Sequence, residues 1–551
     1  LGAALTTPER LPSTVRWIMT AGYLTALNKI AEEENAARRA EGKDTKARPV
    51  NVTLELARQA LKAAKDVPSA ERVHAVLEEG GQLGAGAKAG CERIVTVARA
   101  AFETGAPIGS DDVSSAFNAM KRPAMLDAVD AMWKEGNGLV ANFYGGPSLA
   151  FYMYTDDLGQ IRVRIILGWE GARMGCPLGS LLFDLTEHHF IFRHLKQRFP
   201  TITFMALTDD LIPIFPPPER PGDFAATIQL AASLRKEWDA LANPIGLVRH
   251  PDKGGLLLPG VDKGKRKELT ALGAEHGIRV RYDGVMVGGS PVGSQAYVGR
   301  MALAKAKNDG DARLAAILTV AVVEPIMCMR LIATHARSAY TYYTRVTPTN
   351  LIAAMIKHHD TAVDNARAKA LHRRGVPLVE CSDQRMRRAD GLAQLATAHG
   401  GFGHIPLWTL AAPNYLAGMT AVCHSPDFAC LKVLDTYIKS AYKTTARLLG
   451  HKSHIPEASP EGRILPPDHR HITGVLPPHC SPFQLHRARA EQSIGKLVQL
   501  RMRRNVRKEA KQYLPEGKAA PHTTQSDACH VMEVTAHSML GRVFSAPPGE
   551  R

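Results

Sequence analysis

The chain has 551 residues, of which 45% are hydrophobic, and its 69 Lys and Arg outnumber 53 Asp and Glu to give a formal net charge of +16. This length exceeds one ordinary hydrophobic core, so we expect two to four packed regions, and the apolar content excludes a wholly disordered chain. The positive charge favours a polyanionic partner such as nucleic acid, although on composition alone a basic soluble protein without such a partner stays open.

Cysteine usage and apolar runs narrow the class of protein further. The eight cysteines contain no C-x-x-C pair, so neither a zinc ribbon nor a redox motif is supported, and a reducing compartment is expected. The longest apolar run, Leu314 to Val323, is too short to span a bilayer and predicts a buried helix, so no membrane partner is expected. The chain begins at Leu1 without a signal-peptide pattern, and we expect the true N-terminus to lie upstream.

The first hundred residues show helical spacing of apolar side chains. They predict a helix over 15–40, a second over 54–65, and a glycine-rich loop, GQLGAGAKAG (81–90), that opens a helix over 91–102. Glycines in such a loop allow the backbone to approach a ligand closely.

The central and C-terminal parts alternate strand and helix patterns before becoming helical. PIGSDDVSSAFNAM predicts a short strand and turn, and a helix through Trp133 follows. The further predicted elements are strands over 141–154 and 160–168, a turn leading into a long helix over 171–195, a hairpin around 209–210, a helix over 223–242 and helices from Arg300 onward.

Two stretches read TDDL, and each lies between apolar, alternating runs that predict a β-hairpin with carboxylates at its tip. A Mg²⁺-dependent phosphoryl-transfer enzyme needs such carboxylates. Asp156 and Asp157 precede a strand that alternates with arginines, as in a half-exposed hairpin, whereas Asp209 and Asp210 have strongly apolar flanks in which carboxylates need a cation. The hairpin pattern alone leaves both pairs open.

The order of the neighbouring segments resembles the palm motifs of reverse transcriptases, specifically those of non-LTR retrotransposons. The segments are D-V-S-S-A-F-N from Asp112, G-A-R-M-G-C-P-L-G-S-L-L-F (171–183) and L-T-D-D (207–210). In that order they resemble D-x-x-x-A-F-N/D, G-x-x-Q-G-x-P-L-x-P-L-L-F and Y/F-x-D-D. The resemblance makes Asp209 and Asp210 the catalytic pair, because the first TDDL falls where the family has an ordinary hairpin.

The resemblance extends from about residue 13 to 420. Further matching segments are VRWIMTAGYLTALNKI, ARPVNV, QLGAGAKAGCERIVTVAR, HPDKGGLLLP, VGGSPVG and GGFGHIPLWTLAAPNYLAGM. It implies an α+β right-hand polymerase followed by a mainly helical, basic extension. The implied parts are fingers over 1–105, a palm with an antiparallel sheet over 106–298, a helical thumb over 299–345 and the extension over 346–551.

The activity that the resemblance implies is RNA-directed DNA polymerisation with two Mg²⁺ ions. Asp112, Asp209 and Asp210 would hold the metals together with the carbonyl of Val113, since hard cations prefer oxygen ligands. The implied partners are an RNA template, a DNA primer and deoxynucleoside triphosphates, and the implied place of action is the nucleus.

The resemblance also implies positions that would bind substrate. Phe117 would exclude the 2′-OH of a ribonucleotide, with a simple core aromatic as the alternative. Arg48, Lys253 and Lys29 would bind triphosphate or template backbone, or be solvated surface cations. The loop containing Gly175 and Pro177 would lie against the template–nucleotide pair.

The sequence also departs from the family pattern. Met174 replaces the usual glutamine, Gly179-Ser180 stands where a proline is common, and Leu207 replaces an aromatic. A catalytically inactive, RNA-binding scaffold is therefore a second hypothesis, and a group II intron maturase-like or other palm polymerase is a third. The basic stretches 371–375 and 501–511 would contact a nucleic-acid backbone or be solvated helix faces.

Overall fold

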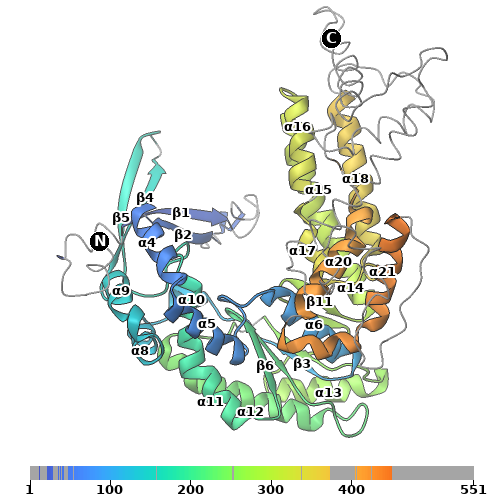
Figure 1. The fold of residues 1–551 in the computed structure, drawn as a ribbon, viewed down its shortest axis with the longest axis horizontal. Coiled ribbons are helices and arrows are strands. Elements are labelled where there is room, and N and C mark those ends of the chain that lie inside the picture. Colours follow the sequence, from blue (N-terminus) through green and yellow to red (C-terminus); the bar gives the residue numbers. More distant parts are fainter. Residues whose placement is uncertain are drawn as a thin grey trace, which may run out of the picture. The chain divides into compact units, whose positions relative to one another are not determined.

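The computed structural model describes residues 21–28 and 47–53, then 55–372 without 157, 251, 252 and 337, then 404–449 without 405 and 424, and the single residues 12, 35, 37, 38, 40 and 41. The chain divides into two compact units (Figure 1). The first unit comprises Leu1–Ile94 and Ala101–Gly288, and the second comprises Val95–Ala100 and Gly289–Arg551.

A five-stranded sheet forms the centre of the first unit, with the strand order β6-β7-β3-β8-β9. Neighbouring strands are antiparallel except for the parallel pair β8 and β9. The strands are β6 (Thr203–Leu207), β7 (Asp210–Ile214), β3 (Ile108–Ser110), β8 (Gly255–Leu257) and β9 (Val280–Arg281). Because β3 lies between β7 and β8, the residues that follow β3 emerge beside the start of β7.

Helices from several parts of the chain, together with this sheet, form the main core of the first unit. Leu77, Phe183 and Trp238, from three different helices, are each at most 2% exposed. Burial of one such side chain stabilises the fold by about 1.5–3 kcal/mol. The helices are α4 (Glu55–Lys65), α5 (Pro68–Glu79), α7 (Ala116–Ala119), α8 (Arg122–Met132), α9 (Lys134–Tyr144), α10 (Gly179–Glu187), a π-helical turn (His188–Phe192), α11 (Arg193–Arg198), α12 (Ala225–Ala242), the 3₁₀ turn Asn243–Ile245, α13 (Lys263–Glu275) and α6 (Gly90–Glu103), of which Val95–Ala100 is assigned to the second unit.

A second sheet in the same unit has four strands in the order β2-β1-β4-β5. The strands are β1 (Gly22–Asn28), β2 (Ala47–Thr53), β4 (Ser148–Thr155) and β5 (Ile161–Gly168). β5 is an edge strand, and each of its residues from Ile161 to Leu167 is exposed. The first unit ends with β10 (Gly284–Val287).

The described part of the second unit is almost entirely helical. Its elements are β11 (Ser290–Gly293), α14 (Gln295–Lys305), α15 (Asp311–Val320), α16 (Pro325–Leu331), α17 (Thr341–Val346), α18 (Ala353–His372), α20 (Leu407–Cys423), the 3₁₀ helix Pro426–Lys432, α21 (Asp435–Leu449) and π-helical turns at Ala306–Gly310 and Ile332–Ala336. Among the described helices, none has both the length and the apolar character needed to cross a membrane.

Several predicted elements are confirmed. The predicted mixture of helices and sheets is present, as are the helices near 54–65, 91–102 and 223–242 and the hairpins at both TDDL stretches. The apolar run 314–323 is helical to Val320, and Leu314 is buried, but Val322 and Val323 are exposed.

Two predictions were wrong. The predicted helix over 15–40 contains strand β1, because Gly22–Asn28 pairs along its whole length with Ala47–Thr53, and this long-range ladder overrides the local helical spacing. The strand predicted from 141 begins only at Ser148, because α9 continues to Tyr144 and buries Val140 and Phe143.

The four-part division and the right-hand arrangement remain predictions. The basic stretch 501–511 and residues 373–375 lie outside the described residues.

Candidate metal and phosphate site

Strand pairing brings the predicted carboxylates together at one end of the five-stranded sheet. Ile108 pairs with Ile214, and Asp111 forms a bridge with Leu211 in the same antiparallel register. Continuing this register by one residue places Asp112 opposite Asp210. Asp209 lies in the turn between β6 and β7, directly before Asp210.

The electrostatics reflect this proximity. Burial, followed by the negative charges of Asp209 and Asp112, raises the pKa of Asp210 to about 6, and Lys253 opposes the shift. The Lys253 ammonium lies 2.7 Å from Asp112 Oδ2, with the lysine side chain 60% exposed. The site is therefore a group of mutually repelling carboxylates with one long, exposed lysine side chain at its edge.

The donor set suits a hard divalent cation, because all of its side-chain ligands are carboxylates. In the described part of the chain, no three or more His, Cys, Asp or Glu side chains are already arranged to hold a metal ion. At Asp112 the cation present is the Lys253 ammonium. A metal at Asp112 would lie close to the Lys253 ammonium, which therefore opposes metal binding there.

The neighbouring Asp111 has a different partner. Its carboxylate accepts two hydrogen bonds from the Arg235 guanidinium, at 2.6 Å and 3.3 Å, and both side chains are largely buried. Bidentate pairing of this kind fixes both groups in one geometry. This leaves Asp112, rather than Asp111, as the carboxylate that faces Asp210.

Backbone hydrogen bonds fix the segment around Asp112 and Val113. His250 N–H donates to the Asp112 carbonyl at 2.7 Å, and Ser114 N–H donates to the Val248 carbonyl at 2.8 Å. Val113 lies opposite Arg249 in this short pairing, and its side chain is buried. The Asp112 segment is thus held by β7 on one side and by residues 248–250 on the other.

Phe117 lies on α7 and is half-buried. Its ring stacks on Phe183 of α10, with ring centroids 5.1 Å apart and an interplanar angle of 23°. The stacking fixes the ring orientation while part of the side chain stays accessible. Both predicted roles, core aromatic and contact to a sugar, are compatible with this position.

The loop containing Gly175 and Pro177 leads into α10. Gly175 has a φ of +97°, a conformation that strongly favours glycine, and it is exposed. Two turn hydrogen bonds, Cys176 N–H to the Arg173 carbonyl and Gly179 N–H to the Cys176 carbonyl, shape the loop. Met174 beside it is half-buried.

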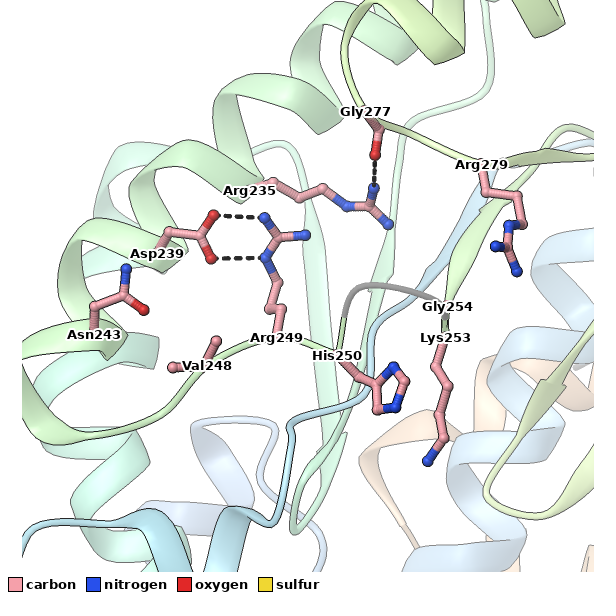
Figure 2. Close-up of a pocket in the computed structure, with 10 residues that line it drawn as sticks. All are labelled: Arg235, Asp239, Asn243, Val248, Arg249, His250, Lys253, Gly254, Gly277 and Arg279. Atoms are coloured by element: carbon pink, nitrogen blue, oxygen red, sulfur yellow. Dashed lines mark hydrogen bonds and ion pairs between the residues drawn. The ribbon is translucent and has the colours of Figure 1, made fainter. Parts of the chain in front are cut away.

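A basic pocket of about 420 Å³ adjoins the carboxylates, because its lining residue Lys253 contacts Asp112. Figure 2 shows the residues that line this pocket. Its charged lining contains one carboxylate, Asp239, and the cations Arg235, Arg249, Lys253 and Arg279. Arg249 pairs with Asp239 in a bidentate geometry at 2.5 Å and 2.8 Å, and this pairing raises the pKa of the guanidinium. A lining of this type suits a phosphate-bearing ligand.

The sequence reasoning identified only Lys253 in this pocket. Arg235, Arg249 and Arg279 were missed because they lie on α12 and on separate loops, outside the matched motifs. Their positions depend on the fold rather than on local spacing.

Other predicted residues lie elsewhere. Asp156 is in the turn between β4 and β5, where its carboxylate accepts hydrogen bonds from Leu158 N–H, Gln160 N–H and the Arg162 guanidinium. The bond from Arg162 is the main cause of its lowered pKa. Arg48 lies on β2 of the four-stranded sheet, whereas Asp157 and Lys29 lie outside the described residues.

The glycine-rich loop approaches protein backbone closely. Leu83 N–H donates to the Ala206 carbonyl, and Ala206 N–H donates to the Gly81 carbonyl, each at 2.8 Å. A Cβ atom on Gly81 would lie 2.2 Å from the Phe204 carbonyl oxygen. The close approach that the glycines allow is therefore made to strand β6.

Comparison with known proteins finds a sequence similarity to a retrotransposon protein. The chain is 29% identical over 171 residues to the retrotransposable element SLACS 132 kDa protein of Trypanosoma brucei gambiense. The match covers 30% of this chain and 13% of that protein. No family model matches the chain.

Solved structures show a distant likeness. Telomerase from Candida albicans, in complex with a TWJ fragment of telomeric RNA, matches 78% of this chain and 63% of its own with 10% identity and a TM-score of 0.40. Apo telomerase from Candida tropicalis matches 78% of this chain and 68% of its own with 10% identity and a TM-score of 0.32. Values this low do not by themselves define a shared fold.

Proposed function

We propose that this chain is an RNA-directed DNA polymerase of the non-LTR retrotransposon type, which adds deoxynucleotides to a DNA primer on an RNA template. The observation that carries the proposal is the convergence of Asp112 with Asp209 and Asp210 at the end of one sheet, beside a basic pocket. The homologous segment in a retrotransposon protein supports the same function. A nuclear place of action belongs to this proposal.

The reaction asks for two things that these residues can provide. The primer 3′-OH attacks the α-phosphate of the incoming nucleotide, a new P–O bond forms, and the bond to pyrophosphate breaks. Two Mg²⁺ ions, when bound by Asp112, Asp209, Asp210 and the Val113 carbonyl, would activate the attacking oxygen and stabilise the leaving group. The cations of the adjoining pocket would neutralise phosphate charge.

Phe117 would select the sugar. Its ring cannot move freely because it stacks on Phe183, so it presents a fixed apolar surface next to the Asp112 segment. A fixed ring excludes a 2′-OH more effectively than a mobile one, since the clash cannot be relieved by rotation. We expect deoxynucleotides to be used in preference to ribonucleotides.

The test is primer extension on an RNA template with Mg²⁺, using wild type, Asp209→Asn and Asp156→Asn. We expect wild type to extend with dNTPs and Asp209→Asn to lose at least about a hundredfold in rate, because a metal ligand is removed. Asp156→Asn should retain the wild-type rate, because Asp156 only closes a hairpin turn.

Two results would contradict the proposal. Equal loss of rate in both variants would overturn the assignment of the carboxylates. Absence of extension by wild type, with RNA binding retained, would favour the inactive scaffold, a function also consistent with Met174, Leu207 and the Lys253–Asp112 ion pair.

A further inference from the structure

One buried side chain, Gln82, forms hydrogen bonds with the backbone of the turn that contains Asp209. Gln82 is 0% exposed and lies in the glycine-rich loop. Its Oε1 accepts a hydrogen bond from Thr208 N–H at 3.1 Å, and its Nε2 donates to the Thr208 carbonyl at 3.2 Å. One amide group therefore satisfies both backbone groups of the residue that precedes Asp209.

Thr208 needs such support because its backbone is strained. It has a φ of +58°, a left-handed conformation that is unfavourable for a β-branched residue. The conformation bends the chain from β6 into β7 and so sets the direction in which Asp209 projects. A strained residue persists only where its surroundings over-determine it.

Gln82 is itself fixed by three further contacts. Its Oε1 also accepts from Gly84 N–H at 3.2 Å, and its Nε2 also donates to Glu187 Oε2 at 2.9 Å. The bridge between Gln82 and Ala206 anchors its backbone to β6. The amide orientation is thus determined from the loop, from α10 and from the sheet together.

The surroundings leave no room for rearrangement. A Cβ atom on Gly84 would lie 2.4 Å from Thr208 Oγ1, 2.6 Å from Thr208 N and 2.7 Å from Asp184 Oδ2. Asp184 and Glu187 are both fully buried, and burial raises the pKa of each carboxyl well above its usual range.

We propose that Gln82 is a positioning residue for the metal-binding turn: its amide, oriented by Glu187, holds Thr208 in the left-handed conformation that aims Asp209 at Asp112. This inference rests on the proposed function. On this inference the glycine-rich loop positions Gln82, because Gly81 and Gly84 let the loop backbone lie close enough for the Gln82 side chain to reach the turn.

The experiment compares wild type with Gln82→Met, which keeps the volume and removes every side-chain hydrogen bond. We expect kcat for dNTP addition to fall between about tenfold and a hundredfold, because a small misplacement of a reacting group is costly. The Mg²⁺ concentration at half-maximal rate should rise, while the KM for dNTP and the Kd for template–primer stay unchanged.

The matched control is Ser69→Ala, which removes the 3.1 Å hydrogen bond from Trp133 Nε1 in the same core, at positions that do not form the turn. A merely structural Gln82 would behave like this control, with a lower Tm and unchanged kcat and Mg²⁺ dependence. That result would overturn the inference.

Gly84→Ala provides a second, independent way to displace Thr208. It should reproduce the raised Mg²⁺ requirement while leaving the Gln82 amide in place. Wild-type kinetics in both variants would reject the positioning role and leave the proposed function intact.

Amide hydrogen exchange over residues 203–214 separates the inference from the function on which it rests. Gln82→Met should accelerate exchange at Thr208, whose N–H loses its acceptor, even if the wild type does not polymerise. If wild type is inactive but exchange is accelerated in the variant, the proposed polymerase function is rejected while support of the Thr208 turn by Gln82 is retained. Unchanged exchange would reject that role.

Discussion

Lys253 lies where a cation is needed, and it competes with any metal that binds Asp112. Its ammonium is 2.7 Å from Asp112 Oδ2, and its side chain is largely exposed, so it can move away without leaving a buried charge. A metal ion and the ammonium repel each other when both lie close to one carboxylate, so the ion pair weakens metal binding.

We therefore predict that Lys253→Met binds Mn²⁺, as a spectroscopic substitute for Mg²⁺, several-fold more tightly than wild type when no nucleotide is present. Electron paramagnetic resonance of free Mn²⁺ measures this affinity directly. Lys253→Arg keeps the positive charge and should retain the wild-type affinity. Equal affinity in Lys253→Met and wild type would show that the ion pair does not restrain metal binding.

The resemblance of the ordered segments groups Asp112, Asp209 and Asp210, and the strand register places Asp112 opposite Asp210. Gln82 could not be assigned a role in this way. Its partners Thr208 and Glu187 are 126 and 105 positions away along the chain, so only the folded structure reveals the hydrogen bonds.

Whether a helix or strand could be predicted from the sequence depends on whether local spacing or long-range pairing determines it. The helix α12 was predictable, because its buried residues recur with helical spacing. Strand β1 was not predictable, because it forms through pairing with β2, a later segment of the chain, whereas the apolar spacing within 15–40 is helical. Local spacing predicts an element well only where tertiary pairing does not compete with it.

A buried histidine on helix α18 in the second unit makes the free energy of unfolding depend on pH in the acidic range. His359 is 5% exposed and packs edge-on against Tyr340, with ring centroids 4.8 Å apart. Burial, with a smaller contribution from His358, lowers the pKa of His359 to about 4, although Asp311 opposes the shift. The folded state therefore holds this histidine neutral.

The sign of the pH effect follows from this shift. Above a pH of about 6.5 the histidine is neutral in both folded and unfolded states, and its full contribution to stability is present. As the pH falls from there toward 4, the unfolded state binds the proton first and is favoured. We estimate a loss of about 1–2 kcal/mol at pH 5.

We predict that His359→Phe, which retains an aromatic ring beside Tyr340, loses less thermal stability between pH 7 and pH 5 than wild type. Thermal unfolding followed by circular dichroism at the two pH values measures this difference. His335→Gln, which removes an exposed histidine from the same unit, should leave the wild-type pH dependence unchanged. Identical acid sensitivity of His359→Phe and wild type would contradict the explanation.

At the scale of the whole molecule, we expect attraction to nucleic acid to depend on the net charge of +16 more than on any single basic patch. In the described pocket, Arg235 and Arg249 already pair with Asp111 and Asp239, so local cations are partly neutralised. We therefore expect Lys and Arg side chains spread over a larger surface to bind a nucleic acid, by displacing counterions from its backbone.

The last prediction concerns this binding. We expect the affinity of the full chain for single-stranded RNA to fall steeply with salt, with a log–log slope of about −3 to −5 if roughly five to seven phosphates are contacted. Fluorescence anisotropy of a labelled RNA at several salt concentrations measures the slope. Asp209→Asn should give the same slope as wild type, because one carboxylate at the turn does not provide a phosphate contact. A flat salt dependence would show that the excess charge is not used to bind RNA, whereas a steep slope shared by both proteins would separate RNA binding from the metal-dependent chemistry assigned to the carboxylates.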